Sequence, residues 1–365
     1  MVDLFKVYAP ENFNRNEFIE ILFSGQLTSG KLVSEFENQI GKYIGNPLVL
    51  VTANQNFASL ITLALLDLKD GDEVIASPMA CLASNQPVIN FRAKLVWADI
   101  DPSTGSLNPD DVRVKITKKT KAIIHYHWCG YPGYIDEINQ IGKEYGVKVI
   151  DDAIESFASK YKGKCMGNVG TDFTTFSFQT VRLPNSIDGG CIAFQSNEMY
   201  EKAKRIRDFG INRLTFRDEL GEISNTSDIS HIGYNAILNE LNAAVGLSTL
   251  SQIDDLLSIQ KRNAILWDES AAIEGKRLNV RTEIEPNYWV YSFLSQNQRV
   301  DLLKLRSKNI YASKVHLRND FYSVFGGLND KLFGVNEFAN SQLAVPSGWW
   351  VNSNDIKNVQ DINIY

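Results

Sequence analysis

Four polar side chains follow two apolar segments of this chain, at spacings that can bring them to one ligand. The run 147–150 has the pattern of a buried strand, and Asp152 and Glu155 come directly after it. A second candidate strand carries Ser177 near its end, and Arg182 follows five residues later. A carboxylate at the end of a buried strand can reach a ligand ring at the sheet edge, and a guanidinium can hold an anion. The segment therefore predicts a site for a small charged ligand.

The same residues also have structural interpretations. Asp152 can cap the helix that follows it, and Glu155, three residues on, can complete a capping box. Arg182 stays charged at physiological pH, so it can neither serve as a neutral amine nor release a proton readily. It could instead hold a phosphate or a substrate carboxylate through two hydrogen bonds.

Three histidines are candidate bases, because imidazole titrates near neutrality. His127 ends a predicted strand and is expected to face the site, although a packed histidine is the more common arrangement at a strand end. His316 lies with Arg318 and Asn319 far along the chain, where they can line a substrate cleft or form a solvated turn. His231 is the third candidate.

The elements that must position these residues alternate between strand and helix. Strands apolar on both faces and separated by helices imply right-handed crossovers and a mainly parallel sheet. We therefore expect an α/β fold whose large lobe has a seven-stranded, mainly parallel sheet between helices, with the site at the strand C-termini. The expected strands are 48–51, 73–76, 95–100, 122–126, 147–150, 173–178 and 191–194, and the expected helices include 32–43, 57–66, 83–91, 134–145 and 198–207.

A second, smaller α+β lobe is expected in the C-terminal part. Around 233–242 the pattern changes to long helices that reach about Ser270, and then to short strands such as 288–294. A chain of 365 residues exceeds one ordinary core, so we predict a large domain over 1–245 and a small domain over 246–365. No repeat or low-complexity linker separates them, which predicts one cooperative unit.

Composition narrows the class of function. The net charge of -6 argues against a nucleic-acid surface. No apolar run approaches the roughly 20 residues needed to span a bilayer, and the first residues lack a signal-peptide core. The four cysteines have neither paired nor metal-like spacing. We expect a reduced, cytoplasmic protein without a metal site, and a small ligand.

The order of these motifs resembles the DegT/StrS family of pyridoxal-phosphate-dependent nucleotide-sugar aminotransferases, which have fold type I. The family pattern is Asp-Ala-Ala-(Gln/Glu/His), then Ser-Phe-x-x-x-Lys, then (Glu/Asp)-Gly-Gly. Here the three parts are Asp152-Ala153-Ile154-Glu155, Ser177-Phe178-Gln179-Thr180-Val181-Arg182 and Asp188-Gly189-Gly190. Matches in the correct order cover nearly the whole chain, at 29–30, 36–37, 71–75, 99–102, 127–132, 233–235, 243–247, 315–320 and 348–350.

The resemblance implies a role for each candidate. Asp152 would pair with the pyridine nitrogen of the cofactor, and Glu155 would lie beside its ring oxygen. Cys81 occupies the region where many members place an aromatic ring over the cofactor. His316, Arg318 and Asn319 fall in a segment similar to a subgroup linked with cell-surface polysaccharide sugars.

The resemblance also implies two sources of phosphate contact. Ser177 matches the phosphate-binding serine, and the turn with Asn54, Gln55 and Asn56 would present backbone N–H groups at the start of a helix. Family members usually have Ser-x-Gly-Thr at this turn, so Asn54 lacks the freedom of glycine. Asn235 matches an asparagine that reaches the phosphate of the neighbouring subunit, and it can also cap the next helix.

The largest departure from the family is Arg182, which falls on the position of the lysine that bonds the cofactor. A Schiff base needs a neutral primary amine, which guanidinium does not provide. Lys202 lies well past the turn, and no other nearby lysine is a convincing replacement. Ile237 also replaces an arginine that is common in the family.

Three functions remain open. The chain is an aminotransferase whose lysine has been replaced, a sugar dehydratase or lyase that uses pyridoxamine phosphate, or a non-catalytic sugar-binding or paralogue-pairing subunit. The cofactor is pyridoxal or pyridoxamine phosphate, held non-covalently if bound, or is absent. The expected partners are a nucleotide-linked sugar and a second copy of the chain, with an active paralogue as the alternative. Neither nucleic acid nor a membrane is expected.

Overall fold

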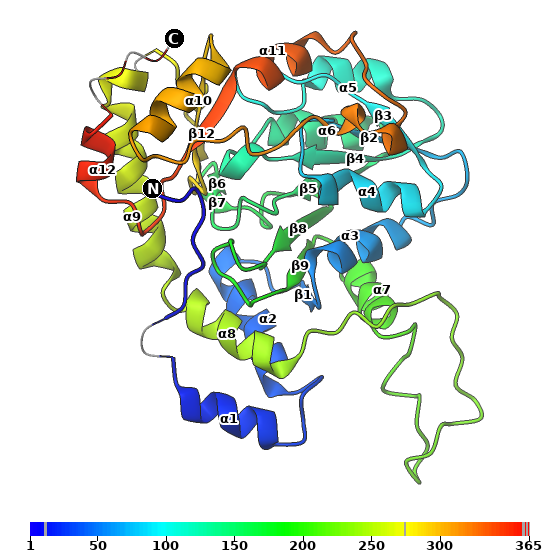
Figure 1. Ribbon diagram of the computed structural model, residues 1–365. Helices are drawn as coiled ribbons and strands as arrows, with labels where there is room; N and C mark the ends of the chain where they lie inside the picture. The colour runs from blue at the N-terminus through cyan, green and yellow to red at the C-terminus, as the bar shows by residue number, and fades with distance from the viewer. Residues whose placement is uncertain (11–12, 274, 360–361, 363, 365) are drawn as a thin grey trace.

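A seven-stranded sheet forms the centre of the molecule in a computed structural model, which describes residues 1–10, 13–273, 275–359, 362 and 364 (Figure 1). Its strands lie in the order β1-β9-β8-β5-β4-β2-β3, with β9 antiparallel to both neighbours and the other pairs parallel. The expected mainly parallel sheet is confirmed, and every predicted strand overlaps an observed one. The strands are β1 (Val49–Thr52), β2 (Glu73–Ala76), β3 (Lys94–Trp97), β4 (Thr120–Tyr126), β5 (Lys148–Asp152), β8 (Phe173–Ser177) and β9 (Gly190–Phe194).

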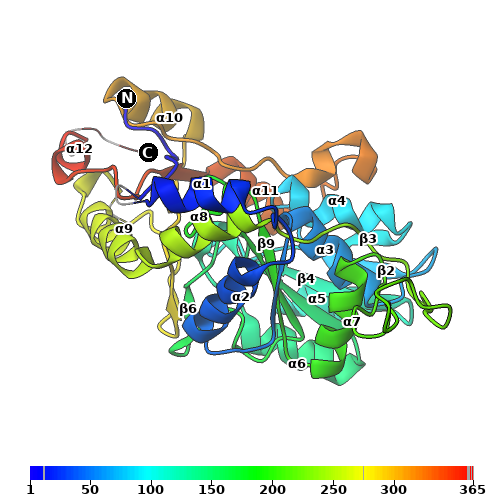
Figure 2. The same cartoon turned by 90° about the horizontal axis from the view of Figure 1, so that it is seen from below.

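Helices cover both faces of this sheet, as the view from below also shows (Figure 2). Successive residues of a strand point to opposite faces. In β5, Val149 packs in the cluster with α6, whereas Ile150 packs in the cluster with α3. Asp151 and Asp152 continue this alternation and therefore face different layers. One layer is α3 (Gln55–Ala64), α4 (Leu82–Asn90) and α7 (Asn197–Arg207), and the other is α2 (Lys31–Ile44), α5 (Pro109–Lys115) and α6 (Ile135–Tyr145).

Helix α2 shows how sequence pattern and tertiary contact combine. Val33, Phe36, Ile40 and Ile44 recur every three or four residues, and all are buried against the sheet. The N-terminus of the helix is capped from a distance, because the buried carboxylate of Glu240 accepts hydrogen bonds from the backbone N–H groups of residues 30, 32 and 33. This contact ties α2 to α8.

The C-terminal part holds most of the remaining helices and short strands. The predicted domain boundary at 245/246 falls within α8 and stays a prediction. No helix in the described residues has both the length and the apolar character needed to cross a membrane. The remaining helices are α1 (Arg15–Phe23), α8 (Glu240–Leu250), α9 (Ile253–Asp268), α10 (Gln298–Ser307), α11 (Phe333–Ser341) and α12 (Ser353–Lys357). The short strands are β6 (Lys160–Tyr161), β7 (Lys164–Cys165), β10 (Ile284–Glu285), β11 (Tyr291–Leu294) and β12 (Gln342–Val345), and the short 3-10 helices are η1 (Trp128–Gly130), η2 (Ala271–Ile273), η3 (Asn319–Phe321) and η4 (Ser323–Phe325).

The first ten residues run as an extended segment beside the C-terminal elements (Figure 1). This N-terminal segment contacts C-terminal residues and also the loop that follows Arg182. Its contacts join Val2 to Ile310, Asp3 to Trp350, Phe5 to Trp289 and Tyr8 to Asn185. These contacts join the N-terminus to residues far along the chain.

Candidate active site

The ring-binding candidate Asp152 lies at the end of β5 on the side of α3 and α4. Its side chain is buried, with 2% of the residue exposed, and Oδ1 accepts a hydrogen bond of 3.4 Å from the backbone of Ile154. Burial raises the pKa of Asp152 to about 6. A carboxylate in this state gains a strong interaction when a cationic group of a ligand lies against it.

The neighbouring Asp151 has the opposite surroundings. Its Oδ1 lies 3.3 Å from His125 Nδ1 and 3.1 Å from His127 Nε2. Although burial opposes ionisation, the two imidazoles hold the pKa of Asp151 below its usual range. Gly133 donates its backbone N–H to His127 Nδ1, so the ring proton of His127 is on Nε2 and faces Asp151.

The structure therefore corrects the expectation that His127 faces the ligand. Its side chain has no exposed surface, and both ring nitrogens contact protein groups. The sequence places His127 at a strand end correctly, but the side chain packs beside Asp151 on the face of the sheet away from Asp152. It holds two adjacent elements together rather than acting as a base.

Glu155 is the centre of the site. Its Oε2 accepts hydrogen bonds from Tyr126 Oη at 2.5 Å and from the backbone N–H of Cys129 at 3.2 Å. Its Oε1 lies 3.1 Å from Arg182 Nη2 and 3.0 Å from His316 Nε2. Burial opposes ionisation, but the neighbouring His316 and Arg182 lower the pKa of Glu155 to about 2. Glu155 is therefore a buried, ionised carboxylate shared by four donors, not a capping-box residue.

Arg182 is held in place on two sides. Besides its bond to Glu155, the guanidinium lies 3.9 Å from the ring centroid of Trp289, a distance typical of a cation–π contact. Phe5 stacks on Trp289 with centroids 4.5 Å apart, and Trp289 Nε1 donates to the Val181 carbonyl at 2.9 Å. Nε and Nη1 of Arg182 are buried and have no hydrogen-bond partner in the described residues. The arginine thus has donors left for a ligand.

The groups predicted to bind a phosphate lie at one edge of the sheet. Gly190 of β9 pairs with Thr52 of β1 on one side and with Ser177 of β8 on the other, so both strands end at the same place. Asn54 caps α3 by accepting from Phe57 N at 3.0 Å. The backbone N–H groups of residues 55 and 56 have no acceptor in the described residues, as expected for the first turn of a helix.

Side chains in this turn differ in availability. Asn54 has φ -161°, an extended conformation open to any residue, so the missing glycine causes no strain here. Gln55 is buried and donates to Ser59 Oγ at 2.8 Å, whereas Asn56 is exposed. Ser177 is buried, and its Oγ accepts from Gln179 N at 3.4 Å. Backbone groups and the Ser177 hydroxyl are therefore the available phosphate ligands.

Cys81 and Asn319 meet beside the ring-binding region. Cys81 directly precedes α4, and burial, followed by the nearby Glu155 charge, raises the pKa of its thiol to about 11. The thiol is therefore neutral and is a packing group rather than a nucleophile. Asn319 is fully buried and donates from Nδ2 to the Ala80 carbonyl at 2.8 Å. It holds the loop that carries Cys81.

Arg318 and Asn319 are not placed to line a substrate cleft. Arg318 is buried and forms a two-point ion pair with Asp320, with both N–O distances at 2.6 Å, and it also donates to Asn336. Arg318 stabilises its own segment and Asn319 ties that segment to the loop of Cys81, contrary to the sequence-based expectation. Of this predicted group only His316 reaches Glu155, with its ring packed edge-on against Trp128 at 5.8 Å.

Asn235 is exposed, and its side chain makes no hydrogen bond to the described residues. The alternative role as a helix cap is wrong, because α8 begins at Glu240 and Asn239 caps it by accepting from Asn242 N at 2.8 Å. The Asn235 amide is therefore available to another molecule.

Sequence inspection missed several groups around the site. The sequence indicated Tyr126 only as a residue of a predicted strand. In the structure Tyr126 pairs with Asp152 in the register of β4 and β5. The backbone of Cys129 adopts φ 50°, and its N–H donates to Glu155. No residue pattern in the sequence predicts this turn. Trp289 was not predicted as a site residue, because its contact with Arg182 joins positions far apart in the sequence.

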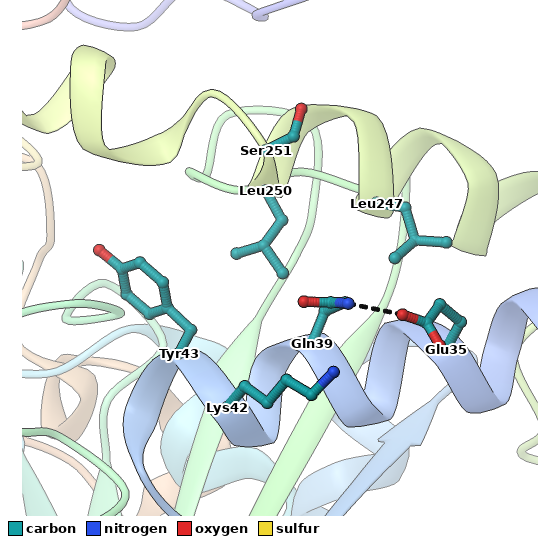
Figure 3. A pocket seen from close by; sticks show the side chains of 7 residues that line it. All are labelled: Glu35, Gln39, Lys42, Tyr43, Leu247, Leu250 and Ser251. Carbon is teal, nitrogen blue, oxygen red and sulfur yellow. Dashed lines mark hydrogen bonds between the residues drawn. The ribbon is translucent and has the colours of Figure 1, made fainter.

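A separate hollow in the described residues lies between α2 and α8 (Figure 3). It is an open groove of about 570 Å³ whose charged side chains are exposed. It contains no predicted site residue, and it lacks the buried ionisable groups that mark the site around Glu155. Its lining is Glu35, Gln39, Lys42, Tyr43, Leu247, Leu250 and Ser251.

The two adjacent aspartates should respond oppositely to neutralisation. Because the folded state raises the pKa of Asp152 from 3.8 to about 6, this group stabilises the fold fully below 3.8 and loses that contribution as the pH rises through 6. We expect Asp152→Asn to raise the stability of the ligand-free protein by about 1–3 kcal/mol at neutral pH. Chemical denaturation across this pH range measures it.

Asp151→Asn is the matched control. It removes the charge between His125 and His127, so stability should fall at neutral pH rather than rise. Equal destabilisation by both changes would show that the surroundings of Asp152 do not penalise its charge.

Comparison with known proteins places this site in context. A model of the DegT/DnrJ/EryC1/StrS aminotransferase family matches residues 10–362. GDP-perosamine synthase of Escherichia coli O157:H7 is 28% identical over 326 residues, covering 87% of this chain and 85% of that protein.

Two solved structures superpose closely on this chain. Sugar aminotransferase CalS13 from Micromonospora echinospora gives a TM-score of 0.92 at 27% identity, covering 99% of this chain and 98% of its own. AtS13 from Actinomadura melliaura gives 0.91 at 30% identity, covering 99% and 97%. These superpositions confirm the fold-type-I architecture. The chain belongs to the DegT/DnrJ/EryC1/StrS family, a family of pyridoxal-phosphate-dependent sugar aminotransferases.

Proposed function

We propose that this protein binds a nucleotide-linked keto-sugar in the synthesis of cell-surface polysaccharide, and that ordinary transamination is impaired. The observation that carries the proposal is Arg182, which we assign to the position of the family's cofactor-bonding lysine. Its guanidinium is bound to the buried Glu155 and stacked on Trp289. These contacts suit a permanent cation, so the arginine is integrated into the site. The names of the relatives, a GDP-sugar synthase and a sugar aminotransferase, support the substrate class.

The residues fit a pyridoxal or pyridoxamine phosphate in part. Asp152 is a buried carboxylate suited to a protonated ring nitrogen, and Ser177 with the start of α3 offers donors for a phosphate. When bound, the group would supply an electron-accepting ring. Arg182 does not fit the lysine role, because it has no neutral amine. We therefore propose that the cofactor is held non-covalently.

Absorption spectra of the purified protein with and without added pyridoxal phosphate test this proposal. We expect the cofactor to bind without the band of a lysine-bonded form. Borohydride reduction followed by peptide mass spectrometry should find no cofactor on any lysine. A reducible adduct on a lysine would contradict the proposal of a non-covalent cofactor, and failure to bind any nucleotide-linked keto-sugar would contradict the proposed substrate class.

We also propose a cytoplasmic homodimer whose two sites lie at the interface. Large apolar side chains are exposed on α1, where Phe23 is 81% exposed, and on the loop before Asn235, where Leu214 is 93% exposed. Such surfaces favour association. The free Asn235 amide would complete the partner's phosphate site, and the interface should exceed about 2,000 Å². Sedimentation showing a stable folded monomer at micromolar concentration would oppose this.

Asn235→Ala tests the shared site. We expect weaker cofactor binding, by about tenfold for one lost hydrogen bond to a phosphate, with an unchanged dimer and melting temperature. Titration calorimetry and sedimentation measure these quantities. Asn239→Ala is the matched control, because it removes the α8 cap and should lower stability by about 1 kcal/mol. Loss of stability alone in Asn235→Ala would reject the shared-site role.

A further inference from the structure

His316 and Glu155 form a histidine–carboxylate pair that transamination chemistry leaves unassigned. His316 Nε2 lies 3.0 Å from Glu155 Oε1, and the side chain of His316 is 15% exposed, whereas that of Glu155 is fully covered. In its neutral form His316 donates from Nε2 to the ionised Glu155 and keeps a lone pair on Nδ1. His316 Nδ1 makes no hydrogen bond to the described residues. Such a pair presents an oriented base.

Arg182 supplies a fixed positive charge next to this base. Its Nη2 and His316 Nε2 contact the same carboxylate oxygen of Glu155, so the two groups share one small region. Two further nitrogens of the guanidinium, Nε and Nη1, are buried and lack partners in the described residues. Donors in this state stabilise negative charge that develops on a substrate oxygen.

We infer that this site catalyses proton exchange at the carbon next to the ketone of its nucleotide-linked keto-sugar, independently of any cofactor. The substrate class rests on the function proposed above. The C–H bond breaks as His316 Nδ1 takes the proton, and the electron pair forms the carbon–carbon double bond of an enolate. Arg182 holds the enolate oxygen. Return of a proton from the imidazole, which exchanges with water, restores the ketone without any oxidant or reductant.

The other ionisable groups near the site do not provide this chemistry. Asp152 lies on the side of α3 and α4, and Cys81 holds a neutral thiol. His127 is bound on both nitrogens. An exchange of this kind is the first half of an epimerisation or a keto-group migration, so the product class is an isomer of the bound keto-sugar.

Deuterium exchange tests the inference. Nucleoside-diphosphate ketohexoses are first screened for binding to the purified protein by saturation-transfer NMR, and the one that binds is then incubated with the protein in D₂O. We expect incorporation of one deuterium next to the ketone, measured by mass spectrometry against a sample without protein, whether or not pyridoxamine phosphate is added. Binding without exchange above background would overturn this inference alone. Absence of binding would overturn the proposed function, and this inference with it.

His316→Ala identifies the base. The exchange rate should fall by about 100-fold or more, the usual contribution of a general base, while the keto-sugar still binds. Added imidazole should restore part of the rate, because it can occupy the vacated space and take the proton. A purely structural role for His316 predicts no such rescue. Retention of the full rate in His316→Ala would reject the assignment.

Discussion

Arg182→Lys should convert a protein with no cofactor–lysine bond into one that carries it on nearly every chain. The substitution supplies a primary amine at the position that family members use, while Asp152 and Ser177 remain as partners for the ring and the phosphate. The measurement is the absorption band of the lysine-bonded cofactor, together with a borohydride-reducible adduct mapped by mass spectrometry. Amino transfer to the bound keto-sugar should appear with it.

The control is Arg113→Lys. Arg113 forms a surface ion pair with Glu144 at 2.6 Å, and the same exchange there should leave cofactor bonding and spectra unchanged. If Arg182→Lys folds normally but binds no cofactor, the pocket itself is unsuited to the group. That outcome would favour a non-catalytic binding subunit.

Glu155→Gln should be among the most destabilising single changes in this protein. It leaves the buried Arg182 guanidinium without its counter-charge and replaces one accepting oxygen by an NH2 donor that faces other donors. Breaking one partner of a buried ion pair costs about 3–5 kcal/mol. Urea denaturation at neutral pH measures the loss. Glu144→Gln is the matched control, because the same change in an exposed pair should cost about 0–1 kcal/mol.

The pH dependence of this difference has a defined sign. The pKa of Glu155 is lowered from 4.5 to about 2, so its stabilising contribution is complete above 4.5 and disappears as the pH falls toward 2. The stability gap between the parent protein and Glu155→Gln should therefore close over that range. A gap that stays constant down to pH 2 would show that charge is not what Glu155 contributes.

The strand ends that carry the candidate residues were predictable, because short segments of sequence indicate them. The apolar run 147–150 indicates a strand buried on both faces, and strand alternation then separates Asp151 from Asp152. The strands carrying Ser177 and Gly190 are equally clear in the sequence. Parallel strands end together, so the ring-binding and phosphate-binding candidates were predicted to lie close to one another, as they do.

The contacts of Glu155 and Arg182 were not predictable, because they join distant parts of the chain. His316 is 161 positions from Glu155, and no short-range pattern reports such a distance. Two predictions from local sequence patterns were wrong. Asn235 was predicted as a possible cap of the next helix, but α8 begins five residues later, at Glu240. Arg318 was predicted to line a cleft, whereas its ion pair with Asp320 keeps it buried.

The enclosure of His125 and His127 around Asp151 makes the protein convenient to probe chemically. The chain has four histidines, and these two have no exposed surface. An acylating reagent that attacks neutral imidazole can therefore reach only His231 and His316 in the folded protein. Protection of one acylation site by a bound nucleotide-sugar would report occupancy of the site around Glu155 directly, without a label, an engineered cysteine or a measurement of turnover.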